Sequence, residues 1–417
     1  MKNKIKVVWL CSFSDRKIRK NLKFPKWYWG NVVRKMMGMR FDIDFAVWDS
    51  NAIAEYEKLG GIELHVVAAH CGNGNIQEFE ENGIYYHVVW SEYDVIAEKI
   101  KRKLNKRDLN SFPHFRKNIA RIIHKINPDI VHVIGIENKF HSMAVLDLPV
   151  NIPVIAQLQT LVSDERFKAS AGETEQEYQY NSDIEKRIMQ RANYIGTAVL
   201  RFREIITADI MPNAVFVDTT LPLTEKVNIE QNEKKYDFVY FSANINKAAD
   251  WAIEAFILAA KKQPNITLDI IGGYDETYKS FLENRLKEND LLKNVTFEGK
   301  LPTHDDVIKH IRLSRFALIP LKIDIVSGTI REAMANGLPV VTTVTPGTPE
   351  LNKKMECVLL SAPKDFNEMA ENMLELMNNK IHADTLRQNA LHLANERESN
   401  SNIIKGWLSA YHDIVEK

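Results

Sequence analysis

The chain has 417 residues, more than one ordinary hydrophobic core accommodates, so we expect two or three domains. A hydrophobic fraction of 45% with 26% charged residues excludes wholesale disorder. The cysteines, Cys11, Cys71 and Cys357, lie far apart without CxxC or Cys/His spacing, which argues against a disulfide framework or a zinc site. No apolar stretch approaches the ~20 residues of a membrane span. We therefore expect a cytoplasmic protein, or one peripheral on the inner face of the membrane.

The net charge is zero, but basic residues concentrate near the start of the chain, where residues 1–125 hold 23 Lys and Arg against 14 Asp and Glu. Segment 16–40 has nine basic and no acidic residues, interleaved with Phe24, Trp27, Tyr28 and Trp29. Two interpretations stay open: a solvated basic face, or a contact with an anionic membrane or a phosphate-bearing acceptor. A nucleic-acid partner is disfavoured, because no RNP, helix-turn-helix or zinc-finger pattern accompanies the charge.

In the first half of the chain, short β-branched runs alternate with helical patterns, which predicts a parallel α/β architecture. The predicted strands lie at 5–11, 62–68, 85–89, 129–134, 154–157 and 192–196. The predicted helices lie at 92–105, 112–126 and 181–192.

The alternation stops at 208–235, which contains Pro212, Pro222 and a polar run and is interpreted as an interdomain connection. It then restarts, with strands predicted at 237–241, 267–271, 295–297, 316–320 and 339–343. Helices are predicted at 251–262, 275–289, 304–313 and 329–336, and the remainder from 365 is mostly helical. The pattern predicts two α/β domains, at 1–207 and 236–399.

The most informative segment is 316–350, where a buried strand ends at Pro320 and Ser327-Gly328-Thr329 opens a helix. Glycine lets the backbone approach a ligand, and a helix start offers unpaired N–H groups and a favourable dipole to an anion. Asp324 and Glu332 flank this turn, and their carboxylates can accept hydrogen bonds from sugar hydroxyls. The alternative is an ordinary Ser/Thr helix cap followed by a surface glutamate.

Together with its surroundings, this segment resembles the family 4 glycosyltransferases of the GT-B fold, which carry Glu-x7-Glu followed by Ala-Met-Ala-x-Gly-x-Pro-Val-Val. Here Asp324-x7-Glu332 precedes Ala-Met-Ala-Asn-Gly-Leu-Pro-Val-Val at 333–341. Upstream, residues 270–273 resemble the family's strand–Gly element, and residues 295–299 resemble its Val-x-Phe-x-Gly element. Residues 246–256 resemble its lysine-bearing segment. The resemblance implies two Rossmann-like domains facing a central cleft, with a C-terminal helix at 400–417 crossing back onto the first.

The resemblance also implies roles for single residues. Glu332 would bind the ribose and Asp324 the donor sugar, while the Ser327 and Gly328 amides and Lys247 would bind the diphosphate. The remaining donor-site positions are Asn244, Gly272, Gly299 and Thr329. Such enzymes manage charge with basic side chains and helix dipoles, so neither a metal nor a cofactor is expected. Two departures are Asp324 in place of Glu and Asn244 in place of Arg.

The N-terminal half resembles the family more weakly, through 128–142, which is similar to bacterial polysaccharide members, and through 153–159. Ser12, Glu137, His141 and Gln159 follow predicted strands. Because α/β sheets place ligands at the carboxyl ends of their strands, these four are candidates to line the acceptor side of the cleft. Asp129 and His132 are expected in the core or in a turn.

The predicted function is a retaining, metal-independent glycosyltransferase with Asp324, Glu332 and Lys247 as its catalytic residues. It would move a sugar from a nucleoside-diphosphate sugar to a glycan or lipid-linked acceptor, in cell-surface polysaccharide or glycolipid synthesis. By family analogy the donor phosphate takes the acceptor proton, so no protein base is named. Two alternatives remain: a non-catalytic or weakly active nucleotide-sugar-binding subunit, and a GT-B sugar-nucleotide epimerase.

Overall fold

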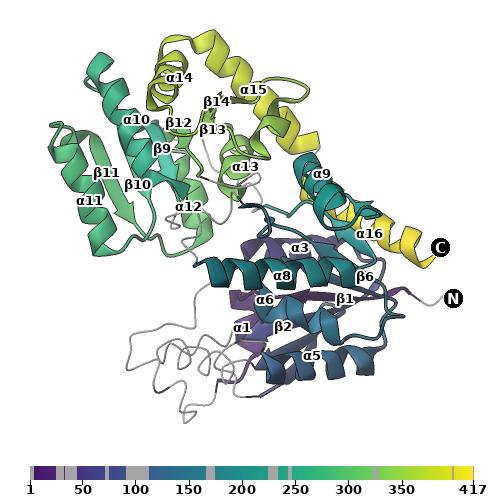
Figure 1. Cartoon of the computed structure of the whole chain (residues 1–417). Helices are drawn as coiled ribbons and strands as arrows, with labels where there is room; N and C mark the ends of the chain where they lie inside the picture. The colour runs from purple at the N-terminus through teal and green to yellow at the C-terminus, as the bar shows by residue number, and fades with distance from the viewer. Residues whose placement is uncertain are drawn as a thin grey trace. The chain divides into compact units, whose positions relative to one another are not determined.

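The computed structural model describes residues 4–24, 32, 45–70, 75–90, 112–165, 174–223, 233–242, 247–322, 327–396 and 399–416. They belong to two compact units, Met1–Pro222 with Asn400–Lys417, and Leu223–Ser399 (Figure 1). Asn244, Asp324, the helix predicted at 92–105 and most of segment 16–40 lie outside the described residues.

The first unit is built on an eight-stranded sheet in the order β3-β4-β2-β1-β5-β6-β7-β8. Its pairs are parallel except β3–β4, which is antiparallel. The strands are β1 (Lys6–Cys11), β2 (Glu63–His70), β3 (Gln77–Glu81), β4 (Ile84–Trp90), β5 (Ile130–Ile134), β6 (Val154–Gln157), β7 (Tyr194–Gly196) and β8 (Phe216–Val217). The helices are α1 (Arg16–Asn21), α3 (Val47–Leu59), α5 (Pro113–Ile126), α6 (Lys139–Ser142), α8 (Glu175–Arg191), α9 (Leu200–Asp209) and α16 (Asn400–Val415).

Alternation along the strands divides the first unit's apolar side chains between two faces. Val7, Trp9 and Cys11 pack in one cluster with residues of α1, α3 and α16, while α5 and α8 contact the sheet at β4 and β6. Tyr411 anchors α16, because its hydroxyl accepts a hydrogen bond from Trp9 Nε1 (2.9 Å) and lies 2.6 Å from His132 Nδ1. Burial lowers the pKa of His132 to about 3, so its neutral ring accepts from Tyr411.

The structure differs from the sequence prediction at the boundary between the two units and at three short strands. The first unit continues past residue 207, because β8 pairs with β7 and so extends the first sheet into the predicted connection. Strands β3, β8 and β14 (Val358–Ser361) were not predicted. β8 has only two residues, and β3 carries the polar sequence QEFEE, so neither gives a strong apolar signal.

The second unit is built on a six-stranded sheet of parallel pairs in the order β11-β10-β9-β12-β13-β14. The other strands are β9 (Tyr236–Phe241), β10 (Leu268–Ile271), β11 (Val295–Gly299), β12 (Ser314–Ile319) and β13 (Val340–Thr343). The helices are α10 (Ala249–Lys262), α11 (Glu276–Lys287), α12 (His304–Ile311), α13 (Gly328–Ala335), α14 (Phe366–Asn378) and α15 (Lys380–Glu396).

Helices cover both faces of this second sheet (Figure 1). Phe238 and Tyr240 of β9 pack with α10, α11 and α14, whereas Val239 and Phe241 pack with α12 and α13. Such two-sided burial explains why these strands appear in the sequence as continuous apolar runs. None of the helices among the described residues has the length and apolarity that crossing a membrane requires.

Each sheet contains one point at which the strand order reverses. In the first unit β1 lies between β2 and β5, and in the second unit β9 lies between β10 and β12. Connections from the two neighbouring strands leave in opposite directions at such a point, which opens a crevice at their carboxyl ends. The fold therefore gives each unit one preferred ligand position.

Candidate functional site

The reversal point of the second unit brings together Lys247, which follows β9, and Ser327, which follows β12. Lys247 Nζ donates a hydrogen bond to Ser327 Oγ at 2.6 Å, although the residues are 80 positions apart. The Tyr240 hydroxyl donates to the Lys247 carbonyl and so helps to fix the backbone of Lys247. Ser327 is buried and caps α13, since its Oγ also accepts from Thr329 N (3.3 Å) and lies 2.6 Å from Thr329 Oγ1.

The electrostatics of this arrangement favour an anion. A helix N-terminus carries a partial positive charge, so an ammonium group beside it is unfavourable until a negative ligand arrives. Lys247 contacts the N-cap of α13, and α10 begins two residues after Lys247 at a cap, Ala248, without a side-chain hydrogen bond. The combination of a lysine with two helix starts is suited to phosphate oxygens.

Glu332 lies in the second turn of α13 and is buried, which excludes the alternative of a surface glutamate. Its Oε1 lies 2.7 Å from Nε2 of His304, the first residue of α12. Burial by itself lowers the pKa of His304, but the hydrogen bond and charge of Glu332 outweigh it, so the pKa is raised. The pair fixes the orientation of the carboxylate, whose remaining lone pairs can accept from ligand hydroxyls.

Glycines at the neighbouring strand ends leave space around the site. Gly272 N donates to Gly299 O at 2.9 Å, which joins the carboxyl ends of β10 and β11. Gly299 has a φ of 71°, a left-handed conformation that L side chains rarely adopt. A Cβ built on Gly328 would meet no heavy atom within 4 Å, so the first turn of α13 is open on that side.

Most of the predicted donor positions thus gather around one reversal point. Lys247, Ser327, Gly328 and Thr329 form its centre, and Glu332 follows one turn later. Gly272 follows the adjacent strand β10, and Gly299 ends the edge strand β11. The sequence analysis missed His304 and Lys322, whose Nζ lies 3.2 Å from Asp250 Oδ1. A single histidine at a helix start or a single lysine after a strand has no local signature, so spacing alone could not identify them.

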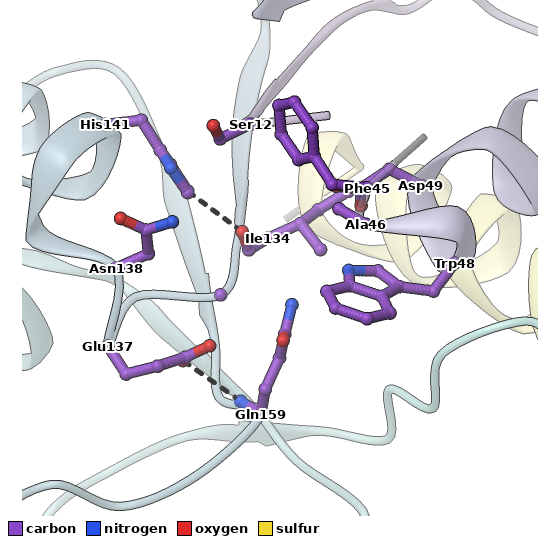
Figure 2. Close-up of a pocket in the computed structure, with 11 residues that line it drawn as sticks. Ser12, Phe45, Ala46, Trp48, Asp49, Ile134, Glu137, Asn138, His141 and Gln159 are labelled. Atoms are coloured by element: carbon purple, nitrogen blue, oxygen red, sulfur yellow. Dashed lines mark hydrogen bonds between the residues drawn. The ribbon is translucent and has the colours of Figure 1, made fainter. Parts of the chain in front are cut away.

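The reversal point of the first unit contains a pocket of about 240 Å³ (Figure 2). The ends of β1, β5 and β6 and the start of α3 supply its lining. It collects the four residues proposed from the sequence as acceptor-side candidates: Ser12, Glu137, His141 and Gln159. It also includes Phe45, Trp48 and Asp49, which the sequence analysis missed because a tryptophan at a helix start is usually a packing residue.

Hydrogen bonds hold the pocket's polar side chains in place. Glu137 Oε2 accepts from Gln159 N at 3.3 Å. The Gln159 amide can be oriented so that it forms two hydrogen bonds. In that orientation its nitrogen donates to Glu137 Oε1 (3.2 Å) and its oxygen accepts from Trp48 Nε1 (3.1 Å). His141 Nε2 donates to the Ile134 carbonyl at 3.0 Å, while its buried Nδ1 has no hydrogen-bond partner among the described residues. That nitrogen can accept a hydrogen bond from a ligand hydroxyl.

Burial keeps the titratable groups of this pocket close to neutral. It raises the pKa of Glu137 to about 8 and lowers that of His141 to about 4. Burial, followed by the nearby Glu137 charge, raises the pKa of Asp49 well above its ordinary value. At neutral pH Glu137 and His141 are therefore mainly uncharged, and such donors and acceptors suit hydroxyl groups better than phosphate.

In the described part of segment 16–40, two lysines pair with acidic residues, although their side chains stay more than half exposed. Lys17 pairs with Glu57 (3.2 Å) and Lys20 with Glu81 (2.5 Å), and Arg19 donates to Ser14 Oγ (2.9 Å). These acidic partners come from α3 and β3, which are remote in sequence. Trp27, Tyr28 and Trp29 lie outside the described residues, so the membrane contact stays a prediction.

Comparisons with known proteins identify a family match in the second half of the chain and relatives of the same fold. Residues 224–392 match the family described as glycosyl transferases group 1. The whole chain is similar to sucrose-phosphate synthase from Thermosynechococcus elongatus, with 16% identity, a TM-score of 0.70 and 99% of each chain covered. A search of curated protein sequences finds no match.

Two further solved structures share the fold. Anabaena HepE in complex with UDP and glucose has 13% identity and a TM-score of 0.64, covering 98% of this chain and 99% of HepE. The pneumococcal O-GlcNAc transferase GtfA in complex with UDP and GlcNAc has 14% identity and a TM-score of 0.56, covering 72% of this chain and 60% of GtfA. The two units have the Rossmann-like α/β fold of GT-B glycosyltransferases, and residues 224–392 match the glycosyl transferases group 1 family.

Proposed function

We propose that this chain is a retaining, metal-independent glycosyltransferase of the family 4 type that uses a nucleoside-diphosphate sugar. The observation that carries the proposal is the contact of Lys247 with the N-cap of α13, one turn before the buried Glu332. The cation and the helix N–H groups are suited to a diphosphate, and the oriented carboxylate beside them is suited to a ribose.

In this proposal each group of the second site has one task. The amides of Ser327 and Gly328 bind phosphate oxygens, Lys247 neutralises the negative charge that grows on the leaving diphosphate, and Glu332 accepts from the ribose hydroxyls. Asp324 holds the donor sugar by resemblance to the family. Uridine is the first nucleotide to test, since HepE and GtfA were both solved with UDP.

The pocket of the first unit is the proposed acceptor site. Its neutral carboxyl, amide and imidazole groups can exchange hydrogen bonds with sugar hydroxyls without competing for the diphosphate. Trp48 adds a partly exposed indole, a side chain that combines an apolar surface with a donor. We therefore propose a glycan or a lipid-linked glycan as acceptor, in the synthesis of a cell-surface polysaccharide or glycolipid.

Product analysis tests the reaction class. The purified chain is incubated with UDP-sugars and an oligosaccharide acceptor panel, and NMR reads the anomeric configuration of any product. A glycoside with the donor's configuration supports the proposal, and an inverted product overturns the retaining assignment. Glu137, whose pKa of about 8 makes it a proton donor near neutral pH, favours an epimerase as the second candidate. An epimerised nucleotide sugar formed without acceptor would establish that candidate instead.

Chelation tests the metal-independent part. Transfer should continue in EDTA, because Lys247 and the helix starts supply the positive charge that a metal ion gives elsewhere. The rate is measured with and without EDTA at a temperature at which circular dichroism shows folded protein. Complete loss of transfer that magnesium or manganese restores would contradict the proposal.

A further inference from the structure

Three side chains of the second unit, outside the proposed donor site, place potential metal ligands close together. Asp269 belongs to β10, Glu298 to the edge strand β11, and His310 to α12. His310 Nε2 lies 3.1 Å from Asp269 Oδ2 and 3.5 Å from Glu298 Oε1. The three ligand atoms all lie within 4.8 Å of one another.

Asp269 is the unusual member of this group because its side chain is completely buried. Neither of its carboxylate oxygens, nor His310 Nε2, has a hydrogen-bond partner among the described residues. The 3.1 Å approach therefore lacks the angles of a hydrogen bond. A buried carboxylate without hydrogen bonds is costly, and either protonation or a neighbouring positive charge can relieve that cost. The neighbouring Glu298 carboxylate adds to the cost instead of relieving it.

The two separations from the His310 nitrogen suit a tetrahedral ion. Zn²⁺ binds histidine nitrogen and carboxylate oxygen at about 2.0–2.2 Å, which places tetrahedral ligands about 3.3–3.6 Å apart. The two distances from His310 Nε2, 3.1 and 3.5 Å, lie close to that separation. The side chains of His310 and Glu298 are 20% and 29% exposed, whereas that of Asp269 is completely buried.

We propose that Asp269, Glu298 and His310 form a binding site for a divalent transition-metal ion, with Zn²⁺ as the best-fitting probe. The ion would neutralise the buried carboxylate and fasten α12 to the β10–β11 edge of the sheet. The Tyr236 ring stacks on the His310 imidazole at a centroid distance of 6.5 Å and helps to orient it. Imidazole nitrogens and carboxylate oxygens are both typical zinc ligands.

The site is separate from the proposed catalysis but shares a helix with it. His310 lies near the end of α12, and His304, which holds Glu332, begins the same helix about 9 Å away along its axis. A bound ion would therefore limit the movement of α12 beneath the Glu332 carboxylate. This consequence rests on the proposed function, whereas metal binding itself does not.

The experiment uses the full chain, freed of metal by a chelator and then dialysed. Zn²⁺ is titrated by calorimetry, Co²⁺ binding is followed by visible absorption, and the melting temperature is measured with and without Zn²⁺. The test variants are Asp269→Asn, Glu298→Gln and His310→Gln. The control is His382→Gln, because His382 also contacts two carboxylates, Glu356 (2.8 Å) and Glu375 (2.9 Å), but through opposite ring nitrogens that cannot share one ion.

Wild type and His382→Gln should bind one Zn²⁺ and gain thermal stability, because a ligand that binds only the folded state stabilises it. Each test variant that circular dichroism shows to be folded should bind at least about tenfold more weakly. His310→Gln and Glu298→Gln keep the test valid if Asp269→Asn fails to fold. Absence of Zn²⁺ binding by wild type, or equal binding by His310→Gln, would overturn the proposal. The cluster would then be only an Asp269–His310 ion pair. Loss of Zn²⁺ binding with transfer intact would leave the proposed function standing.

Discussion

The two units place their sites at the same point of the same fold, yet the chemistry of the sites is opposite. The second unit gathers Lys247 at a helix N-terminus and His304 with a raised pKa. The first unit gathers Glu137 with a pKa of about 8 and His141 with a pKa of about 4. The fold determines where a ligand binds, and the charge of the side chains determines which ligand it is.

Burial has different results in the two sites because the partners differ. His304 is opposed by the Glu332 carboxylate, whose hydrogen bond outweighs the cost of burying a cation. Glu137 and His141 have amide and carbonyl partners, which cannot compensate a buried charge, so both shift toward their neutral forms. Variants that act on one site and spare the other test this contrast.

The largest effect is expected from removing the lysine of the second site. Lys247→Ala should lower kcat about 10²–10³-fold, the range found when one group that stabilises transition-state charge is deleted. Steady-state kinetics with a nucleotide sugar measure it, and Lys261→Ala, an exposed lysine of the same unit, is the control. If both variants retain wild-type kcat, Lys247 does not serve the leaving group.

A smaller loss is expected from Glu332. Because this residue is buried against His304, Glu332→Gln is preferable to alanine, which would leave the imidazolium without its partner. A charge-assisted hydrogen bond contributes about 1.5–3 kcal/mol, so nucleotide affinity should fall roughly 10–100-fold. Calorimetry with UDP measures the change. Unchanged affinity in a folded variant would remove Glu332 from the nucleotide site.

Gly135 allows the first site to be altered alone. It has a φ of 81°, and an added Cβ would lie 2.7 Å from the end of the Gln159 amide and 3.0 Å from Glu137 Oε1. Gly135→Ala should raise the acceptor KM at least about tenfold, equivalent to about 1.4 kcal/mol, while UDP affinity stays the same. Gly83→Ala is the matched control, because Gly83 has a φ of 76° but no heavy atom within 4 Å of the added Cβ. An equal acceptor KM in the two variants would argue against the pocket as acceptor site.

The smallest effect concerns pH. The folded-state pKa of His304 is raised, so its stabilising contribution is complete below the ordinary histidine value of about 6.5 and is lost as pH rises through the folded value. The difference in melting temperature between wild type and His304→Gln should therefore shrink as pH rises above about 6.5. The pKa of His382 is also raised, by its two carboxylate partners. Its pH-dependent contribution to stability is the same in both proteins and therefore cancels in the difference. A melting-temperature difference that grows with pH would contradict the assignment of His304 and Glu332 as a charged pair.

Sequence patterns alone located the framework of the second site. The strands at 236–241 and 314–319 are apolar on both faces, and Ser327 is a helix-capping residue beside a glycine, so both signals lie within a few consecutive residues. The same reasoning found Ser12, Glu137, His141 and Gln159 as strand-end residues, because strand ends can be recognised from a run of a few apolar side chains.

Only the tertiary structure determined the partners and therefore the charges. His304 and Glu332 are 28 residues apart, and Trp48 and Gln159 are more than 100 residues apart, so no local pattern records either contact. The pKa of a side chain depends on the water it loses and on the charges brought within a few ångströms, and folding sets both. The sequence thus determined where the strands end and which side chains follow them. The packing around those ends decided which site is cationic and which is neutral.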